Sequence, residues 1–198
     1  GTHAAFPQQG TDVMVAASHL VTALQTVSSR TIDPMEAVVV SITQIHAGET
    51  YNIIPEEITL KGTIRSFKNE VQVLAETAIH RLTKGVSDAF GINGNFICTP
   101  GYPATVNSMK ESTFAEKIAA DVVGSDKVLK NLPPKMGAED FSYMLNEKPG
   151  CYIWIGNGPG ESGCYLHNPQ YDFNDEILPI GASYWSRLVE QHLDKIPD

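Results

Sequence analysis

The order of hydrophobic patterns in the first hundred residues restricts the fold of this chain more than any other feature. Apolar residues recur at helical spacing over 12–28 and again over 71–90. Between these segments, residues 37–45 and 58–67 alternate between apolar and polar side chains, as strands with one buried face do. A further short strand is predicted at 95–99. The expected order is helix, strand, strand, helix, strand, which is an α+β arrangement.

Residues at the ends of these segments agree with that order. Thr11 or Asp12 can cap the first helix, and Gly91 can end the second. A loop near 46–56 would join the two alternating segments as an antiparallel pair. A strand ahead of Gly1 would complete a βαββαβ, ferredoxin-like sandwich. We therefore expect the chain to lack the first strand of such a fold and to be a fragment.

The rest of the chain predicts a second, thinner domain that follows a proline- and glycine-rich segment. The expected elements are helices over 112–123, from Glu139 and over 179–193, and strands at 128–129 and 151–155. So few strands are typical of half an α/β layer whose other half lies elsewhere. We therefore expect domains at 1–101 and 102–198.

The composition excludes several classes of partner. The 198 residues include 14 Lys and Arg against 23 Asp and Glu, for a formal net charge of −9. Because no basic run occurs, nucleic acid has no positive surface to bind. No apolar stretch has the length of a membrane span. Three cysteines without a CxxC pair argue against a disulfide framework or a structural zinc site, and favour a reducing, cytoplasmic location.

One histidine is the best candidate metal ligand. His167 follows a glycine-rich loop, 156–163, and has Asp172 and Asp175 close by in the sequence. Imidazole suits zinc, manganese, nickel and iron, and a neighbouring carboxylate can orient the ring. The alternative is a loop histidine hydrogen-bonded to one of these aspartates. A metal site needs three or four ligands, and the sequence shows no others near His167.

Three further polar residues are candidates for a site. His3 lies among small residues ahead of the first helix, where the ordinary alternative is a surface histidine in a turn. Asn52 lies in the loop between the strands, where asparagine commonly serves turn geometry. Arg65 is on the non-apolar face of its strand, and its guanidinium can clamp a carboxylate through two hydrogen bonds. The remaining histidines are expected to be structural or solvated: His19, His46, His80 and His192.

Four segments, in order, resemble consecutive motifs of one enzyme family. They are Gly1–Pro7, the loop Gly48–Pro55 with the strand Gly62–Phe67 after it, Met136–Phe141, and Leu166–Asp175. The family is the metal-dependent amidohydrolases, which include hippurate hydrolase, plant auxin-conjugate hydrolases, aminoacylases and glutamate carboxypeptidase. The resemblance covers nearly the whole chain with compatible spacing.

The resemblance implies a fold and an activity. In this family a ferredoxin-like lid, which usually mediates dimerisation, interrupts a two-metal catalytic domain of the zinc-peptidase type. Residues 1–101 would be the lid and 102–198 the C-terminal part of the metallopeptidase catalytic domain. The implied reaction is hydrolysis of an amide bond in N-acyl amino acids or short peptides, with two Mn or Zn ions per intact site. The other ligands would lie in the first part of that domain, so this chain alone is expected to be inactive.

The resemblance also implies roles for the four candidate residues. His167 matches the family's C-terminal metal ligand. His3 matches a lid histidine that stabilises the oxyanion, often across a homodimer. Asn52 and Arg65 match groups that hold the free carboxylate of the substrate.

Two questions stay open at this level. Thr2 stands where the family often has glycine, and Gln8 where it often has histidine, so the subfamily and substrate are not determined. A function of another class is also open. The ferredoxin-like sandwich could be a non-catalytic module that dimerises or binds a small effector, with His167 merely structural.

Overall fold

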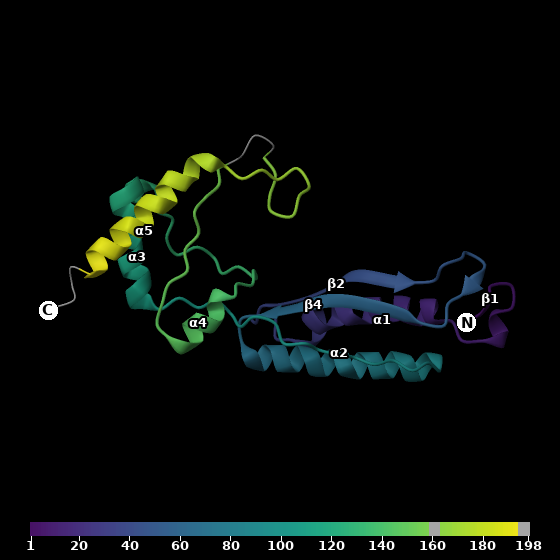
Figure 1. Ribbon diagram of the computed structural model, residues 1–198. Helices are drawn as coiled ribbons and strands as arrows, with labels where there is room; N and C mark the ends of the chain where they lie inside the picture. The colour runs from purple at the N-terminus through teal and green to yellow at the C-terminus, as the bar shows by residue number, and fades with distance from the viewer. Residues whose placement is uncertain (159–162, 194–198) are drawn as a thin grey trace. The chain divides into compact units, whose positions relative to one another are not determined.

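Two units make up the chain (Figure 1), Gly1–Ala104 and Thr105–Asp198. Each has its own hydrophobic core. The computed structural model describes residues 1–158 and 163–193, so residues 159–162 of the glycine-rich loop lie outside it. Both sheets in the described part are antiparallel pairs of strands. The class is therefore mixed α/β. No helix in this part is both long and apolar enough to cross a membrane.

Helix α1 (Val13–Thr26) begins next to the carboxylate that caps it. The Asp12 side chain accepts hydrogen bonds from the N–H groups of Met14 at 2.9 Å and Val15 at 3.1 Å. These bonds satisfy two N–H groups that have no helical carbonyl to bind. The predicted first helix is confirmed, and it continues into a π-helical segment, η2 (Val27–Thr31).

Strands β2 (Val38–Ala47) and β4 (Ile58–Ser66) form the predicted antiparallel pair. Val40 lies opposite Ile64, and both side chains pack against the core of the first unit. The alternating pattern therefore predicted the buried face of this pair correctly.

A β-bulge interrupts β2 where the register shifts between Ile42 and Gln44. Opposite it, Gly62 comes so close to the other strand that an added Cβ would lie 2.1 Å from the Ser41 carbonyl oxygen. Only glycine avoids that overlap without a shift of the backbone. Alternation alone does not predict a bulge, because it assumes an unbroken two-residue period.

Helix α2 (Asn69–Phe90) ends at Gly91, whose φ of 64° lies in the left-handed region that glycine adopts freely. Helices α1 and α2 cover the same face of the β2–β4 pair (Figure 1). Burial of the apolar surface between them drives this packing. The buried core residues are Leu24, Val27, Ile32, Val71, Ala75, Ala78 and Ile79.

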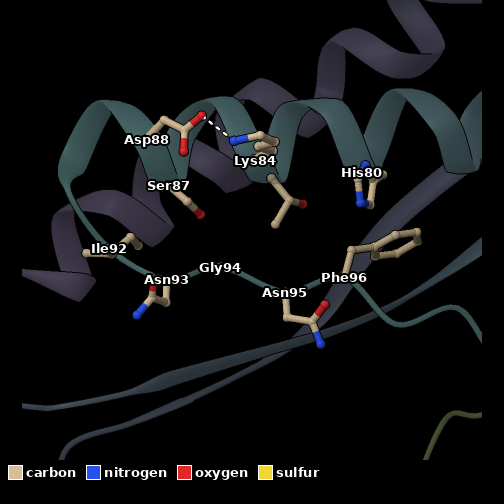
Figure 2. A pocket seen from close by; sticks show the side chains of 10 residues that line it. His80, Lys84, Ser87, Asp88, Ile92, Asn93, Gly94, Asn95 and Phe96 are labelled. Carbon is tan, nitrogen blue, oxygen red and sulfur yellow. Dashed lines mark hydrogen bonds and ion pairs between the residues drawn. The ribbon is translucent and has the colours of Figure 1, made fainter.

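The strand predicted at 95–99 is not formed. These residues belong to neither described sheet, and the chain before them runs alongside α2 (Figure 2). A strand is stable when its backbone groups pair with a neighbouring strand, and this segment has none. Instead, Phe96 packs against the core, and Gly94 lies against Ser87, where an added Cβ would be 2.0 Å from Oγ.

The sequence predicts only a loop at 46–56, but part of that loop is a strand. Strand β3 (Ile53–Ile54) pairs with β1 (Thr2–His3) in antiparallel register. Strands of two residues are too short for alternation to reveal. A single 3₁₀ turn, η1 (Pro7–Gln9), follows β1. The pairing fastens the N-terminal residues to the connecting loop of the β2–β4 hairpin.

The second unit is mainly helical. Its elements are α3 (Met109–Val123), η3 (Ser125–Lys127), α4 (Phe141–Glu147), η4 (Asp175–Ile177) and α5 (Leu178–Leu193). Helices α3 and α5 pack together through Ala115, Ile118 and Tyr184, which are buried. The three helices predicted in this region are confirmed.

The strands predicted at 128–129 and 151–155 are not formed either. At Tyr152 the backbone pairs with a side chain, because its N–H donates to Asn107 Oδ1 and its carbonyl accepts from Asn107 Nδ2, both at 2.8 Å. An apolar run predicts burial, but a strand also needs a neighbouring segment with free backbone groups.

Candidate functional site

His3 and Asn52 meet at the connecting end of the β2–β4 hairpin. His3 lies opposite Ile53 in the β1–β3 pair, and the Ala4 N–H donates to the Asn52 carbonyl at 3.0 Å. Both candidate side chains are exposed. The fold therefore brings together two of the four residues that the sequence singles out.

A backbone hydrogen bond determines which nitrogen of the His3 ring can donate. The Ala5 N–H donates to Nδ1 at 3.0 Å, inside a turn that the Phe6 N–H and the His3 carbonyl close at 2.8 Å. Because a backbone N–H can only donate, Nδ1 is the acceptor and the proton of the neutral ring is on Nε2. The exposed ring therefore offers one N–H donor, at Nε2, to a ligand.

Arg65 lies at the opposite end of the hairpin. It pairs with Val39, and its Nη1 donates to the Ile64 carbonyl at 3.0 Å. Strand β4 has 9 residues, and a strand of that length is roughly 30 Å long. Within one chain, a small ligand therefore cannot contact Arg65 together with His3 and Asn52.

His167 combines a strained backbone with an exposed ring. Its φ of 71° lies in the left-handed region, which costs a non-glycine residue about 1–2 kcal/mol. The Asn168 N–H donates to the Tyr165 carbonyl at 3.2 Å and so closes a turn around His167. Among the described residues, no hydrogen bond joins the ring to Asp172 or Asp175, so neither aspartate holds it.

The described residues supply part of a metal site at most. Within residues 1–158 and 163–193, no group of three His, Cys, Asp or Glu side chains gathers in a metal-binding arrangement. An exposed imidazole such as that of His167 fits one ligand position of a zinc or manganese centre. A complete centre needs further ligands from elsewhere.

A tyrosine that sequence analysis did not single out lies beside the Met136–Phe141 motif. Burial raises the pKa of the Tyr152 hydroxyl, and a hydrogen bond with Glu139 and the charges of Glu139 and Asp140 raise that pKa further. The Phe141 and Tyr152 rings lie 5.8 Å apart, centre to centre. The raised pKa favours the protonated form of the Tyr152 hydroxyl, which lies beside this acidic motif. Nothing in local sequence spacing reveals this pairing.

A polar pocket lies in the first unit. It has a volume of about 270 Å³ and lies between the C-terminal half of α2 and residues 92–96 (Figure 2). His80 lines it, together with Lys84 and Asp88, whose charged groups are paired at 2.7 Å. None of the four predicted site residues lines this pocket.

Comparisons with known proteins identify relatives of the chain. The model of peptidase family M20/M25/M40 matches residues 5–191. Hippurate hydrolase from Campylobacter jejuni is 36% identical over 197 residues, an alignment that covers 98% of this chain and 50% of that enzyme. An N-acetyldiaminopimelate deacetylase from Streptococcus suis is 36% identical over 192 residues, which covers 96% of this chain and 50% of the deacetylase.

A solved structure is similar as well. The Bacillus subtilis YXEP protein, a dinuclear metal-binding peptidase from the M20 family, superposes with a TM-score of 0.67 at 26% identity, over 96% of this chain and 48% of that one. The chain spans about half the length of the curated relatives it matches. The resemblance to metal-dependent amidohydrolases is thus confirmed. Because the family match extends over residues 5–191, the chain belongs to peptidase family M20/M25/M40.

Proposed function

We propose that this chain supplies the lid and the C-terminal part of the catalytic domain of a metal-dependent amidohydrolase. The enzyme would hydrolyse the amide bond of N-acyl amino acids, or of short peptides with a free carboxylate. Membership of the family is the observation that carries the proposal, and the names of two relatives denote N-acylated amino acids. The three cysteines, with no CxxC spacing among them, support a cytoplasmic location.

Residues 1–101 would be the lid, with a ferredoxin-like sandwich as its complete form. Two helices on one face of an antiparallel strand pair support this assignment. Residues 102–198 would belong to the catalytic domain.

His167 would hold one of two divalent ions, zinc or manganese. Two such ions would supply a water of lowered pKa as the nucleophile and would polarise the scissile carbonyl. The dinuclear metal binding of the similar YXEP protein supports a pair of ions. The remaining ligands would come from the part of the relatives' length that this chain does not span.

His3 would stabilise the oxyanion that forms on the scissile carbonyl. As the carbonyl carbon becomes tetrahedral, its oxygen gains negative charge, and a positioned N–H donor stabilises that charge more than it stabilises the substrate. The bond from the Ala5 N–H supports this role, because it leaves the His3 proton on Nε2. Loss of one such donor raises the activation free energy by roughly 3 kcal/mol.

Asn52 and Arg65 would hold the carboxylate of the substrate, through an amide N–H and a guanidinium. Within one chain they lie at opposite ends of β4, so a site that contains both needs two copies of the chain. The enzyme would therefore be a homodimer paired through the lid, in which His3 and Asn52 of one protomer complete a site with Arg65 of the other.

The test is hydrolysis by the whole protein, expressed from its full reading frame and supplied with Mn²⁺ or Zn²⁺. N-benzoylglycine, a set of N-acetylated amino acids and a set of dipeptides serve as substrates, with the released amino acids measured by mass spectrometry. We expect metal-dependent hydrolysis that His167→Ala abolishes and that the control His46→Ala leaves unchanged. Failure to hydrolyse any of these substrates with either metal would contradict the proposal and favour a non-catalytic module.

A further inference from the structure

The loop that carries His167 is closed at its base by two asparagines, Asn157 and Asn174. The Asn174 N–H donates to Asn157 Oδ1 at 2.8 Å, and Asn174 Nδ2 donates to the Asn157 carbonyl at 3.3 Å. In addition, Asn157 Nδ2 donates to the Asp172 carbonyl at 3.2 Å. Three hydrogen bonds thus join two segments of the chain that local sequence would leave independent.

Asn174 also connects the base of this loop to helix α5 through η4. Its Oδ1 accepts from the Glu176 N–H at 3.0 Å and so caps η4, the 3₁₀ turn that leads directly into α5. At the other side of the base, Gly158 has a φ of 70°, which allows the chain to turn away immediately after Asn157. The two asparagines therefore connect the loop to a packed helix rather than to another loop.

Within the loop, Asn168 forms a turn immediately after His167. Asn168 Oδ1 accepts from the Gln170 N–H at 2.8 Å, and the Asn168 carbonyl accepts from the Tyr171 N–H at 2.9 Å. A non-glycine residue keeps a left-handed backbone only where its surroundings leave it no alternative. These turn bonds lie within residues 168–171, whereas the hydrogen bonds of Asn157 and Asn174 join the two ends of the loop and reach η4.

We propose that Asn157 and Asn174 are positioning residues, which hold His167 in its left-handed conformation so that its ring is presented to a divalent ion. This inference rests on the proposed function, in which His167 is a metal ligand. Residues that orient a metal ligand from outside the ligand set commonly change metal affinity by roughly 10–100-fold when they are removed.

The first arm of the test uses the 198-residue chain itself and needs no metal. NMR scalar couplings report the φ angle of His167, and ¹⁵N relaxation reports the order of its amide. We expect a positive φ and an ordered amide in the wild type, and loss of both in Asn157→Ala. The matched control is Asn146→Ala, which removes an exposed asparagine of α4 in the same unit and should change neither readout.

A second variant separates positioning from folding. Asn174→Asp keeps an oxygen that can cap η4 but removes the Nδ2 donor to the Asn157 carbonyl. It should unfold at the wild-type temperature and still lose order at His167. An Asn174→Asp variant that melts normally and retains an ordered, left-handed His167 would overturn the proposal.

The second arm measures the dissociation constant of Mn²⁺ and of Zn²⁺ in the whole protein. We expect roughly 10–100-fold weaker binding in Asn157→Ala and in Asn174→Asp, and wild-type binding in Asn146→Ala. If His167→Ala weakens metal binding but the asparagine variants do not, the positioning role is wrong and the proposed function stands. If His167→Ala leaves metal binding unchanged, the metal role of His167 is wrong, and this inference falls with it.

Discussion

The Ala4 N–H donates to the Asn52 carbonyl at 3.0 Å and joins the N-terminal strand to the loop of the β2–β4 hairpin. Beside this bond, His3 pairs with Ile53. Two candidate residues from distant parts of the sequence thus occupy one end of the hairpin, while Arg65 occupies the other. His3 and Asn52 of one protomer are therefore expected to act at the same site. Arg65 of that protomer is expected to act at the other site of the dimer.

The neutral His3 ring is expected to be the Nε2–H tautomer, because the Ala5 N–H already occupies Nδ1. Long-range ¹H–¹⁵N correlation spectra at about pH 8.5, where an ordinary imidazole is neutral, distinguish the two nitrogens by chemical shift. His3→Ala identifies the signals. A ring with its proton on Nδ1 would show that the turn does not select the tautomer.

Arg65→Ala in the whole protein should raise KM for carboxylate-bearing substrates by roughly 10–100-fold, the effect of losing a hydrogen bond between charged groups. Arg65→Lys should recover only part of the loss, because an ammonium cannot make two parallel N–H bonds to a carboxylate. Lys61→Ala is the matched control, since Lys61 is exposed on the same face of β4. An equal rise in KM for a carboxamide analogue of the substrate would argue against the role of Arg65.

Heterodimers of two defective variants should recover activity if each site draws residues from both protomers. In a dimer of His3→Ala with Arg65→Ala, one site carries both substitutions and the other carries neither. Differently tagged protomers, co-expressed and purified through both tags, are therefore expected to show about half of wild-type activity. Each homodimeric variant alone remains defective.

A second heterodimer is the matched control. It distinguishes activity that recovers because each site draws residues from both protomers from activity that recovers whenever two variants are combined. His3 and Asn52 lie at the same end of the hairpin, so a dimer of His3→Ala with Asn52→Ala carries one substitution in each site. It should show no recovery. Equal recovery of activity in both heterodimers would mean that the two ends of the hairpin do not contribute to different sites of the dimer.

Two glycine substitutions should change stability in opposite directions. In Gly62→Ala the new Cβ would meet the Ser41 carbonyl oxygen at 2.1 Å. The backbone shift that removes this overlap should destabilise the chain by about 1–3 kcal/mol. In Gly85→Ala, within α2, nothing lies within 4 Å of the new Cβ, and alanine should stabilise the helix by roughly 0.5–1 kcal/mol. Thermal unfolding measures both, and a stabilising Gly62→Ala would mean that the two strands are farther apart than described.

Features that depend on neighbouring residues could be predicted from the sequence. Asp12 caps α1 and Gly91 ends α2, because each acts on backbone groups within one turn of itself. The buried face that contains Val40 and Ile64 followed from alternation. The second predicted strand, 58–67, accordingly corresponds closely to β4.

Features that depend on distant partners could not be predicted. The β1–β3 pair, the bulge after Ile42 and the bond between Glu139 and Tyr152 each require knowledge of which segments meet in space. The strands expected at 95–99 and 151–155 failed for the same reason, since apolar runs do not reveal whether a partner strand is present. The roles of His3, Asn52, Arg65 and His167 stay predictions.

The occupied Nδ1 of His3 has a consequence for acid–base chemistry. A neutral imidazole has a single basic lone pair, and in His3 the main chain already uses it. The ring therefore cannot abstract a proton or coordinate a cation unless the turn at Ala5 first opens. The hydrogen bond from the Ala5 amide thus limits His3 to polarising a bound group, and it prevents the ring from acting as a base.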